Sequence, residues 1–155
     1  MFKRINHQAI AQVLYALDGD LLMKNNCLFG GGTVMAMRFG EYRESVDIDF
    51  IVSSTTGYRE LRQMVGTGLG SLFRDRTLPF APLGEVRTDQ YGIRSMLKVV
   101  GRNIKFEIVR EGRVELEKPR PNDTVCGIAT LTPLDMATSK LLANADRWND
   151  DGAFS

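Results

Sequence analysis

The chain has 155 residues with a formal net charge of +1, and 43% of its residues are hydrophobic and 25% charged. This composition is typical of a globular protein, so we expect one domain with its own core over residues 1–155. The small net charge gives no signal of a global polyanion-binding surface, and no apolar stretch reaches the ~18 residues of a membrane span. The N-terminus has no apolar core of signal-peptide length. Cys27 and Cys126 lie in apolar surroundings, so a disulfide framework is not indicated. We therefore expect a cytoplasmic protein without membrane contact.

In chain order, the spacing of apolar residues predicts a helix, a strand, a helix, a strand, a helix, three strands and a final helix. These elements cover residues 5–17, 27–30, 33–39, 46–52, 57–73, 91–100, 103–110, 125–130 and 132–148. Gly101-Arg102 would form the turn of a hairpin between two of the strands, and the segment from Asp75, with its prolines, is predicted to be irregular. The order favours an α+β fold (mixed α/β), with a mixed β-sheet flanked by helices.

A triple glycine, residues 30–32, separates the first predicted strand from a helix that would begin at Thr33. Glycine allows close backbone approach, and the free N–H groups of a helix start attract anions. The loop is not a Walker A motif, because no Gly-Lys-Ser/Thr follows, and the dinucleotide-binding pattern fails at Met35. Taken alone, these residues are better explained as an ordinary tight turn.

Two carboxylates, Asp47 and Asp49, lie in the apolar run that follows the glycine loop. Side chains in a strand alternate between its faces, so both acids point one way while Ile48 and Phe50 point into the core. Neighbouring carboxylates repel each other and resist burial, so they need a cation. Hard oxygen ligands beside a glycine turn indicate Mg²⁺, or Mn²⁺, together with a nucleoside triphosphate (NTP).

Glu107 is a third candidate acid, in the middle of the predicted strand 103–110, where glutamate is uncommon. Three carboxylates on neighbouring strands are what a two-metal phosphoryl-transfer site needs, so Glu107 is a candidate metal ligand and catalytic residue. The alternative is an exposed strand position that pairs with Lys105 or Arg94.

Four basic residues are candidates for phosphate binding. Lys140 and Arg147 are seven residues apart and therefore share a face of the final helix, where Lys140 would neutralise triphosphate charge. Arg38 and Arg43 flank the connection between the glycine loop and the acidic strand. For each of the four, a solvated side chain or a salt bridge to a nearby carboxylate is the alternative.

Two conspicuous residues have no predicted role in chemistry. His7 is the single histidine and lies far along the chain from the glycine and acidic motifs, so we interpret it as a surface residue. Catalysis by histidine and zinc ligation therefore have no support. Trp148, near the end of the final helix, is predicted to be a packing residue.

The segment FGGGTVMAMRFGEYRESVDIDFIV resembles the metal-binding signature of the DNA polymerase β-like nucleotidyltransferase superfamily. Within it, the S-x-DIDF spelling and the terminal KLLANADRWNDD are most similar to the AbiEii/AbiGii toxin family, over Leu28 to Asp151. The resemblance implies a nucleotidyltransferase core in which Asp47 and Asp49 bind magnesium. It further implies a triphosphate held by Gly31, Gly32 and Thr33, a third acid at Glu107, and a phosphate-binding lysine at Lys140.

The same resemblance implies a function and partners. The protein would transfer a nucleoside monophosphate from an NTP to an acceptor, a tRNA 3′ end or a protein, as the toxin of a toxin–antitoxin or abortive-infection system with a cognate antitoxin. The family also leads us to expect further helices after Ser155. An apolar face left by their absence would favour a homodimer. Two alternatives remain: a catalytically degenerate or truncated core that acts as a binding module, and a metal-dependent phosphohydrolase.

Overall fold

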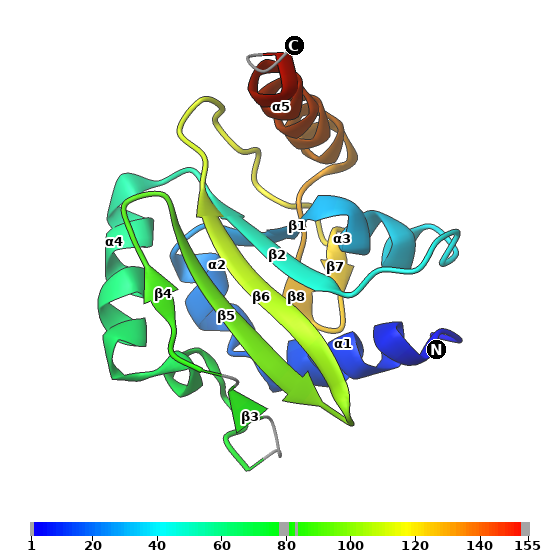
Figure 1. Ribbon diagram of the computed structural model, residues 1–155, viewed down its shortest axis with the longest axis vertical. Coiled ribbons are helices and arrows are strands. Elements are labelled where there is room, and N and C mark those ends of the chain that lie inside the picture. Colours follow the sequence, from blue (N-terminus) through cyan, green and yellow to red (C-terminus); the bar gives the residue numbers. More distant parts are fainter. Residues whose placement is uncertain (1, 78–80, 83, 153–155) are drawn as a thin grey trace.

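A mixed β-sheet lies at the centre of the computed structural model, which describes residues 2–77, 81–82 and 84–152 (Figure 1). Its strands run in the order β1-β2-β6-β5-β3, and β4 also pairs with β5. β2 and β6 are parallel and the other pairs are antiparallel. The strands are β1 (Cys27–Gly30), β2 (Asp47–Val52), β3 (Ala81–Pro82), β4 (Arg87–Thr88), β5 (Gly92–Val99) and β6 (Arg102–Arg110). The predicted mixed sheet flanked by helices is confirmed.

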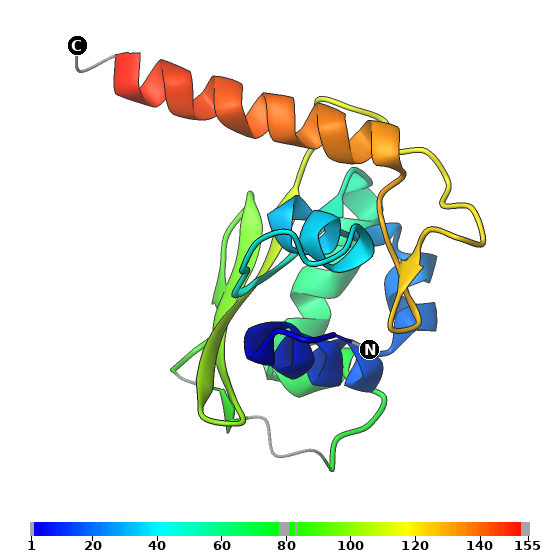
Figure 2. The ribbon, with the colours of Figure 1, turned by 90° about the vertical axis from the view of Figure 1, so that its right-hand side faces the viewer.

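The helices gather on one side of the sheet, and the opposite face carries none of the described helices (Figure 2). The exception is the last helix, α5 (Pro133–Gly152), which crosses one end of the molecule and extends past the uncovered face. A small hairpin of β7 (Thr124–Val125) and β8 (Ile128–Ala129) leads into α5. The helices are α1 (Ile5–Ala16), α2 (Gly19–Lys24), α3 (Gly31–Arg38), α4 (Thr55–Met64) and α5 (Pro133–Gly152).

The core is built from the inward-facing side chains of the central strands. Phe29, Phe50 and Phe106 are fully buried and stack across β1, β2 and β6, with ring centroids 5.6 and 5.7 Å apart. Burying each such side chain contributes about 1.5–3 kcal/mol. Because strand side chains alternate, this packing places Asp49 and Glu107 on the uncovered face of the sheet.

The predicted helix over residues 57–73 is wrong in its second half. α4 ends at Met64 and is followed by two short 3-10 helices, Val65–Thr67 and Leu69–Leu72. Gly68 between them has φ +117°, which no helical residue adopts. The chain therefore turns at this glycine, while the apolar side chains on both sides of it still reach the core.

Two turns also differ from their predicted positions. The stretch 125–130 is not one strand, because Cys126 and Gly127 have φ of +52° and +76° and reverse the chain between β7 and β8. The turn between β5 and β6 is Val100-Gly101, with φ of +50° and +74°, and Arg102 already begins β6. Positive φ at both central residues is the geometry of tight hairpin turns. Of the segment predicted to be irregular, residues 78–80 and 83 lie outside the described residues.

His7 is not a surface residue: its side chain is fully buried. Nδ1 lies 2.9 Å from the Glu41 carboxylate, and the backbone N–H of Ser45 donates to Nε2 at 3.1 Å. A neutral imidazole that donates from Nδ1 and accepts at Nε2 satisfies both contacts. His7 thereby joins α1 to the segment that leads into the acidic strand β2.

We expect His7→Ala to lower the free energy of unfolding by about 2–4 kcal/mol, because it leaves a cavity and removes the partners of a buried N–H and a carboxylate. Chemical denaturation measures this loss. Gln8→Ala, at an exposed position one residue further along α1, is the control and should change stability by less than about 1 kcal/mol. Equal effects of the two substitutions would contradict the role given to His7.

The predicted packing of Trp148 is also wrong, since 78% of the residue is exposed. Leu134, Leu141 and Trp148 follow one another at intervals of seven residues along the same face of α5, and the two leucines are 64% and 69% exposed. The first half of α5 lies over the body of the protein, and its distal half extends past the sheet (Figure 2). Within the described part of the chain, no helix is both long and apolar enough to cross a membrane.

Candidate active site

The glycine loop and the acidic strand touch each other. β1 and β2 pair so that Gly30 lies opposite Asp49. Gly31 then begins α3 with φ +76°, in the left-handed region that favours glycine. A Cβ atom on Gly31 would lie only 2.7 Å from Oδ2 of Asp49. The start of α3 and a carboxylate therefore meet at a distance that only glycine permits.

The two acids of β2 share a face, as the sequence predicts, and both are half-buried. In the parallel pairing of β2 with β6, Asp49 lies opposite Glu107 and Asp47 opposite Lys105. Burial raises the pKa of Asp49 to about 6, and the negative charges of Asp47 and Glu107 add to this rise. The carboxylate of Asp49 is thus under-compensated, and a cation at this point would be strongly favoured.

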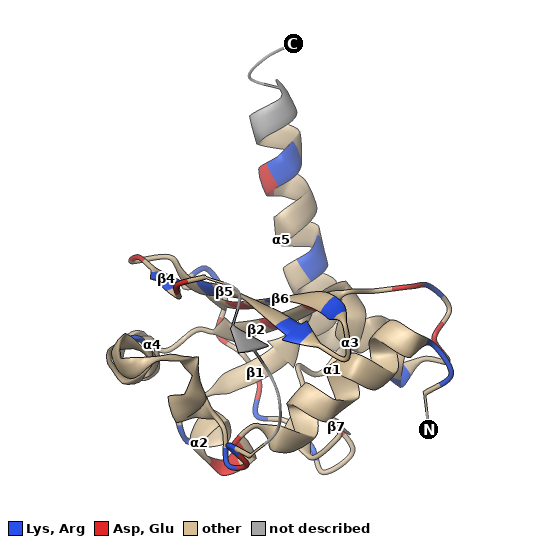
Figure 3. Ribbon diagram, turned by 60° about the horizontal axis from the view of Figure 1, so that its bottom comes forward, with Lys and Arg blue, Asp and Glu red and all other residues tan. Residues whose placement is uncertain are grey.

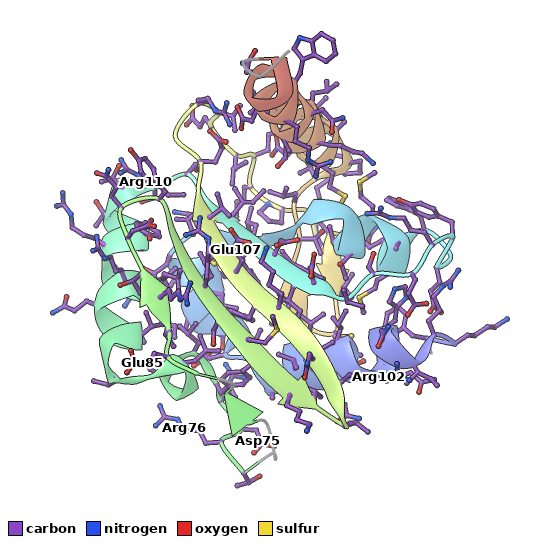
Figure 4. All side chains as sticks on the ribbon, in the orientation of Figure 1. Asp75, Arg76, Glu85, Arg102, Glu107 and Arg110 are labelled. Carbon is purple, nitrogen blue, oxygen red and sulfur yellow. The ribbon has the colours of Figure 1, made fainter. Side chains whose placement is uncertain are left out.

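Glu107 has both of the basic partners that the sequence offered as an alternative. Arg94 donates from Nε at 3.2 Å, and Nζ of Lys105 lies 3.1 Å from the carboxylate, which is 13% exposed. Glu107 points from the middle of β6 on the uncovered face of the sheet (Figure 4). Both of its oxygens are paired, and each keeps a second lone pair with which Glu107 can ligate a metal ion.

The donor set fits a magnesium site in which the protein provides only two carboxylates. No group of three His, Cys, Asp or Glu residues among the described residues is arranged to hold a metal ion. Magnesium does not need such a group, because it is commonly held by one or two carboxylates together with waters and substrate phosphates. Asp47 and Asp49 would be such a pair, next to a helix start whose free N–H groups suit an anion.

A cleft of about 790 Å³ opens beside Asp49 but is not lined by Asp47, and its volume suits a nucleotide. The glycine loop and Asp49 form one wall, Glu107 and the ends of β5 and β6 the floor, and α5 the opposite wall. Figure 3 shows basic positions along α5 and on β5. The basic residues that line the cleft are Arg43, Arg94, Arg110, Arg113, Lys140 and Arg147.

Three of these, Arg94, Arg110 and Arg113, were not among the phosphate-binding residues expected from the sequence. The period-2 alternation of β5 and β6 places Arg94 on the face that carries Glu107, and this signal was available in the sequence. Nothing in the local pattern placed Arg110 or Arg113 opposite α5, because the position of that helix depends on the tertiary fold.

Arg43 lies directly on the glycine loop. A Cβ atom on Gly32 would overlap the guanidinium group of Arg43, so the arginine rests against bare backbone. Thr33 is buried in the first turn of α3 and does not line the cleft, although its N–H belongs to the helix start. The loop and Arg43 together form the positively polarised end of the site.

Arg38 lies elsewhere. Its guanidinium donates to Asp123 and to the Thr130 hydroxyl, each at 3.0 Å, and to the carbonyl of Asn122. These contacts tie the end of α3 to the hairpin of β7 and β8, and Arg38 lines a second, smaller cavity rather than the cleft. The structure therefore places Arg38, unlike Arg43, away from the cleft.

The fold is similar to that of two crystal structures. One is a candidate nucleotidyltransferase from H. pylori, with 16% identity and a TM-score of 0.50 over 88% of this chain. The other is JHP933 from Helicobacter pylori, with 13% identity and a TM-score of 0.52 over 91% of this chain. At these identities the likeness shows the fold alone. The chain spans only 57% and 58% of the lengths of these two proteins.

No curated protein matches the sequence. A family described as nucleotidyl transferase AbiEii toxin, of type IV toxin–antitoxin systems, matches residues 12–153 and thus most of the chain. The match includes the glycine loop, the acidic strand and α5, which form the cleft. This protein belongs to the AbiEii nucleotidyl transferase toxin family.

Proposed function

We propose that this protein is a magnesium-dependent nucleotidyltransferase that moves a nucleoside monophosphate from an NTP to an acceptor hydroxyl, as the toxin of a toxin–antitoxin pair. One observation carries the proposal. Asp49, whose pKa is raised to about 6 by burial and by the charges of Asp47 and Glu107, lies against a left-handed glycine at the start of a helix. This arrangement combines a cation site with a phosphate site.

In this proposal, different residues bind the cation and the triphosphate. Asp47 and Asp49 would hold the divalent cation, which when bound would neutralise phosphate charge and polarise the reacting groups. The backbone N–H groups at the start of α3, from Gly31 to Thr33, donate to the triphosphate. Arg43 adds a charge-assisted contact from the same end of the cleft.

α5 covers the other side of the nucleotide. Lys140 and Arg147 face the cleft from this helix and neutralise the charge of the pyrophosphate leaving group. The acceptor hydroxyl gives its proton to a carboxylate of the site, for which Glu107 is the candidate. The acceptor oxygen forms a bond to the α-phosphorus, and the bond from that phosphorus to the oxygen bridging to the β-phosphate breaks, so pyrophosphate leaves with the electron pair. Glu107, as this base or as a third metal ligand, acts while it is paired with Arg94 and Lys105.

The finer assignments are part of the same proposal. Mg²⁺ is the expected ion, with Mn²⁺ as a substitute that accepts the same oxygen ligands. The acceptor is RNA, such as tRNA, or a protein. A cognate antitoxin, a cytoplasmic location and a homodimer complete the expected setting of the toxin.

The test is to incubate the protein with Mg²⁺, each α-labelled NTP in turn, and total tRNA or cell lysate. We expect label on RNA or on protein, and its loss in the Asp47→Ala/Asp49→Ala variant. Release of free phosphate without labelled acceptor would support a phosphohydrolase instead. A folded protein that labels nothing with any NTP would overturn the transferase proposal.

A further inference from the structure

Arg113, just after β6, holds two carboxylates at once. Its guanidinium donates to Glu111 at 2.7 and 2.8 Å and to Asp146 of α5 at 2.9 and 3.0 Å. Both contacts are bidentate, which is the strongest geometry for an arginine and a carboxylate. We call these three residues the Arg113 clamp.

The clamp bridges two walls of the cleft. Glu111 and Arg113 continue β6 at the end of the sheet, whereas Asp146 lies 33 residues after Arg113 in the distal half of α5. All three residues line the cleft. The clamp therefore spans the same opening that Lys140 and Arg147 face.

Apart from the clamp, α5 is attached to the body of the protein at its N-terminal end. Thr132 caps the helix by accepting from the N–H of Asp135 at 3.2 Å, and Asp135 accepts from the N–H of Glu117 at 2.8 Å. α3 also contacts α5. Beyond the first turns, Leu141 and Trp148 are 69% and 78% exposed. In the described part of the distal half, the ionic contacts with the body of the protein that the structure records are those of Asp146.

We propose that the Arg113 clamp is a positioning unit that holds the distal half of α5 across the cleft, so that Lys140 and Arg147 face the bound nucleotide. The role of those two residues rests on the proposed function, whereas the mechanical role of the clamp does not. Arg113 itself acts as a strut rather than as a phosphate ligand, because two carboxylates already use its charge.

The charges of the clamp persist at neutral pH. Hydrogen bonds from Arg113 hold the pKa of Glu111 and of Asp146 below the ordinary carboxyl range, and the same bonds raise the pKa of Arg113. Asp146 and Arg113 are about half exposed, with side chains 53% and 50% accessible. Salt therefore screens the clamp, and ~1 M salt, where the Debye length is about 3 Å, should mimic its loss.

The experiment compares Arg113→Ala, Asp146→Ala and the double variant by amide hydrogen exchange over residues 139–149, and by NTP affinity, KM and kcat. We expect exchange in this half of α5 to rise, and affinity for Mg²⁺·NTP to fall, by about three- to ten-fold in each single variant. KM should rise more than kcat falls. The double variant should be no worse than either single one, because both break the same contact.

Two further variants sharpen the test. Arg113→Asp combined with Asp146→Arg restores opposite charges beside Glu111 and should recover most of the lost protection, whereas Arg113→Asp alone should not. Arg74→Ala is the matched control, because Arg74 likewise bridges two carboxylates, Asp18 and Asp20, but lies outside the cleft lining. It should leave both exchange in α5 and NTP affinity unchanged.

Unchanged exchange in Arg113→Ala, additive effects of the single variants, or equal effects of Arg74→Ala would overturn the clamp. Hydrogen exchange keeps this test separate from the proposed function. If the wild-type protein binds no NTP, the proposed function fails, while faster exchange in the clamp variants with rescue by the charge exchange still establishes the clamp.

Discussion

Asp49→Asn is expected to abolish nucleotide transfer and, at the same time, to stabilise the metal-free protein. Removal of a cation ligand that no other group replaces should lower the transfer rate by about 10³-fold or more. The gain in stability follows from the half-buried position of Asp49 beside Asp47 and Glu107, which penalises its charge. Stability gained at the cost of activity is the usual signature of a functional site.

The pH dependence of this gain has a definite sign. The pKa of Asp49 is raised from 3.8 to about 6 in the folded protein, so the folded state binds the proton more tightly than the unfolded state does. The favourable contribution of protonated Asp49 is complete below the unfolded pKa and is lost as pH rises through the folded pKa. Asp49→Asn should therefore match the wild type near pH 4 and exceed it above pH 6, by about 2 kcal/mol.

Thermal unfolding from pH 4 to 8, without metal and with excess Mg²⁺, measures the effect. A gain of this size corresponds to about 4–8 °C in Tm for a protein of this length. Mg²⁺ should stabilise the wild type and leave Asp49→Asn unchanged. Asp75→Asn is the control: the pKa of Asp75 is lowered by its hydrogen bonds from Thr77, so its replacement should give no gain. A wild type that is more stable than Asp49→Asn at pH 7.5 without metal would contradict the assignment.

Gly31→Ala should disrupt the proposed catalytic site by a single added methyl group. The residue has φ +76°, which costs a non-glycine residue ~1–2 kcal/mol, and its new Cβ would meet Oδ2 of Asp49 at 2.7 Å. Relief of this contact must move either Asp49 or the start of α3, and both belong to the proposed catalytic site. We expect transfer to fall by about 100-fold or more, because displacements of about 1 Å at a reacting site have effects of that size.

Gly40→Ala tests the effect of backbone strain separately from the steric clash that Gly31→Ala makes with Asp49. Gly40 has φ +85° but nothing within 4 Å of its added Cβ, so it carries the strain alone. Both variants should lose stability, and only Gly31→Ala should lose activity and affinity for Mn²⁺, measured by titration of the free ion. Full activity in Gly31→Ala would mean that the glycine loop does not approach the site as closely as proposed.

The sequence by itself determined which face of each strand carries chemistry. Period-2 alternation put Asp47 and Asp49 on one side of β2 and Glu107 on the same side of β6, while the apolar partners filled the core. The glycine run marked the turn into α3, and these residues together pointed to the family. Such patterns are local, since side-chain direction in a strand and backbone freedom at glycine depend on few neighbours.

The tertiary structure alone decided which charged residues meet. Arg38 and Arg43 look alike in the sequence, but Arg38 pairs with Asp123, 85 residues away, whereas Arg43 rests on Gly32. His7 is buried because Glu41, 34 residues away, is its partner. A long-range pair forms only where the packed elements bring its members together. The sequence around a charged residue does not indicate which distant residue it will pair with. The apolar face of α5 shows the same limit, because periodicity predicts an amphipathic helix but not what packs against it.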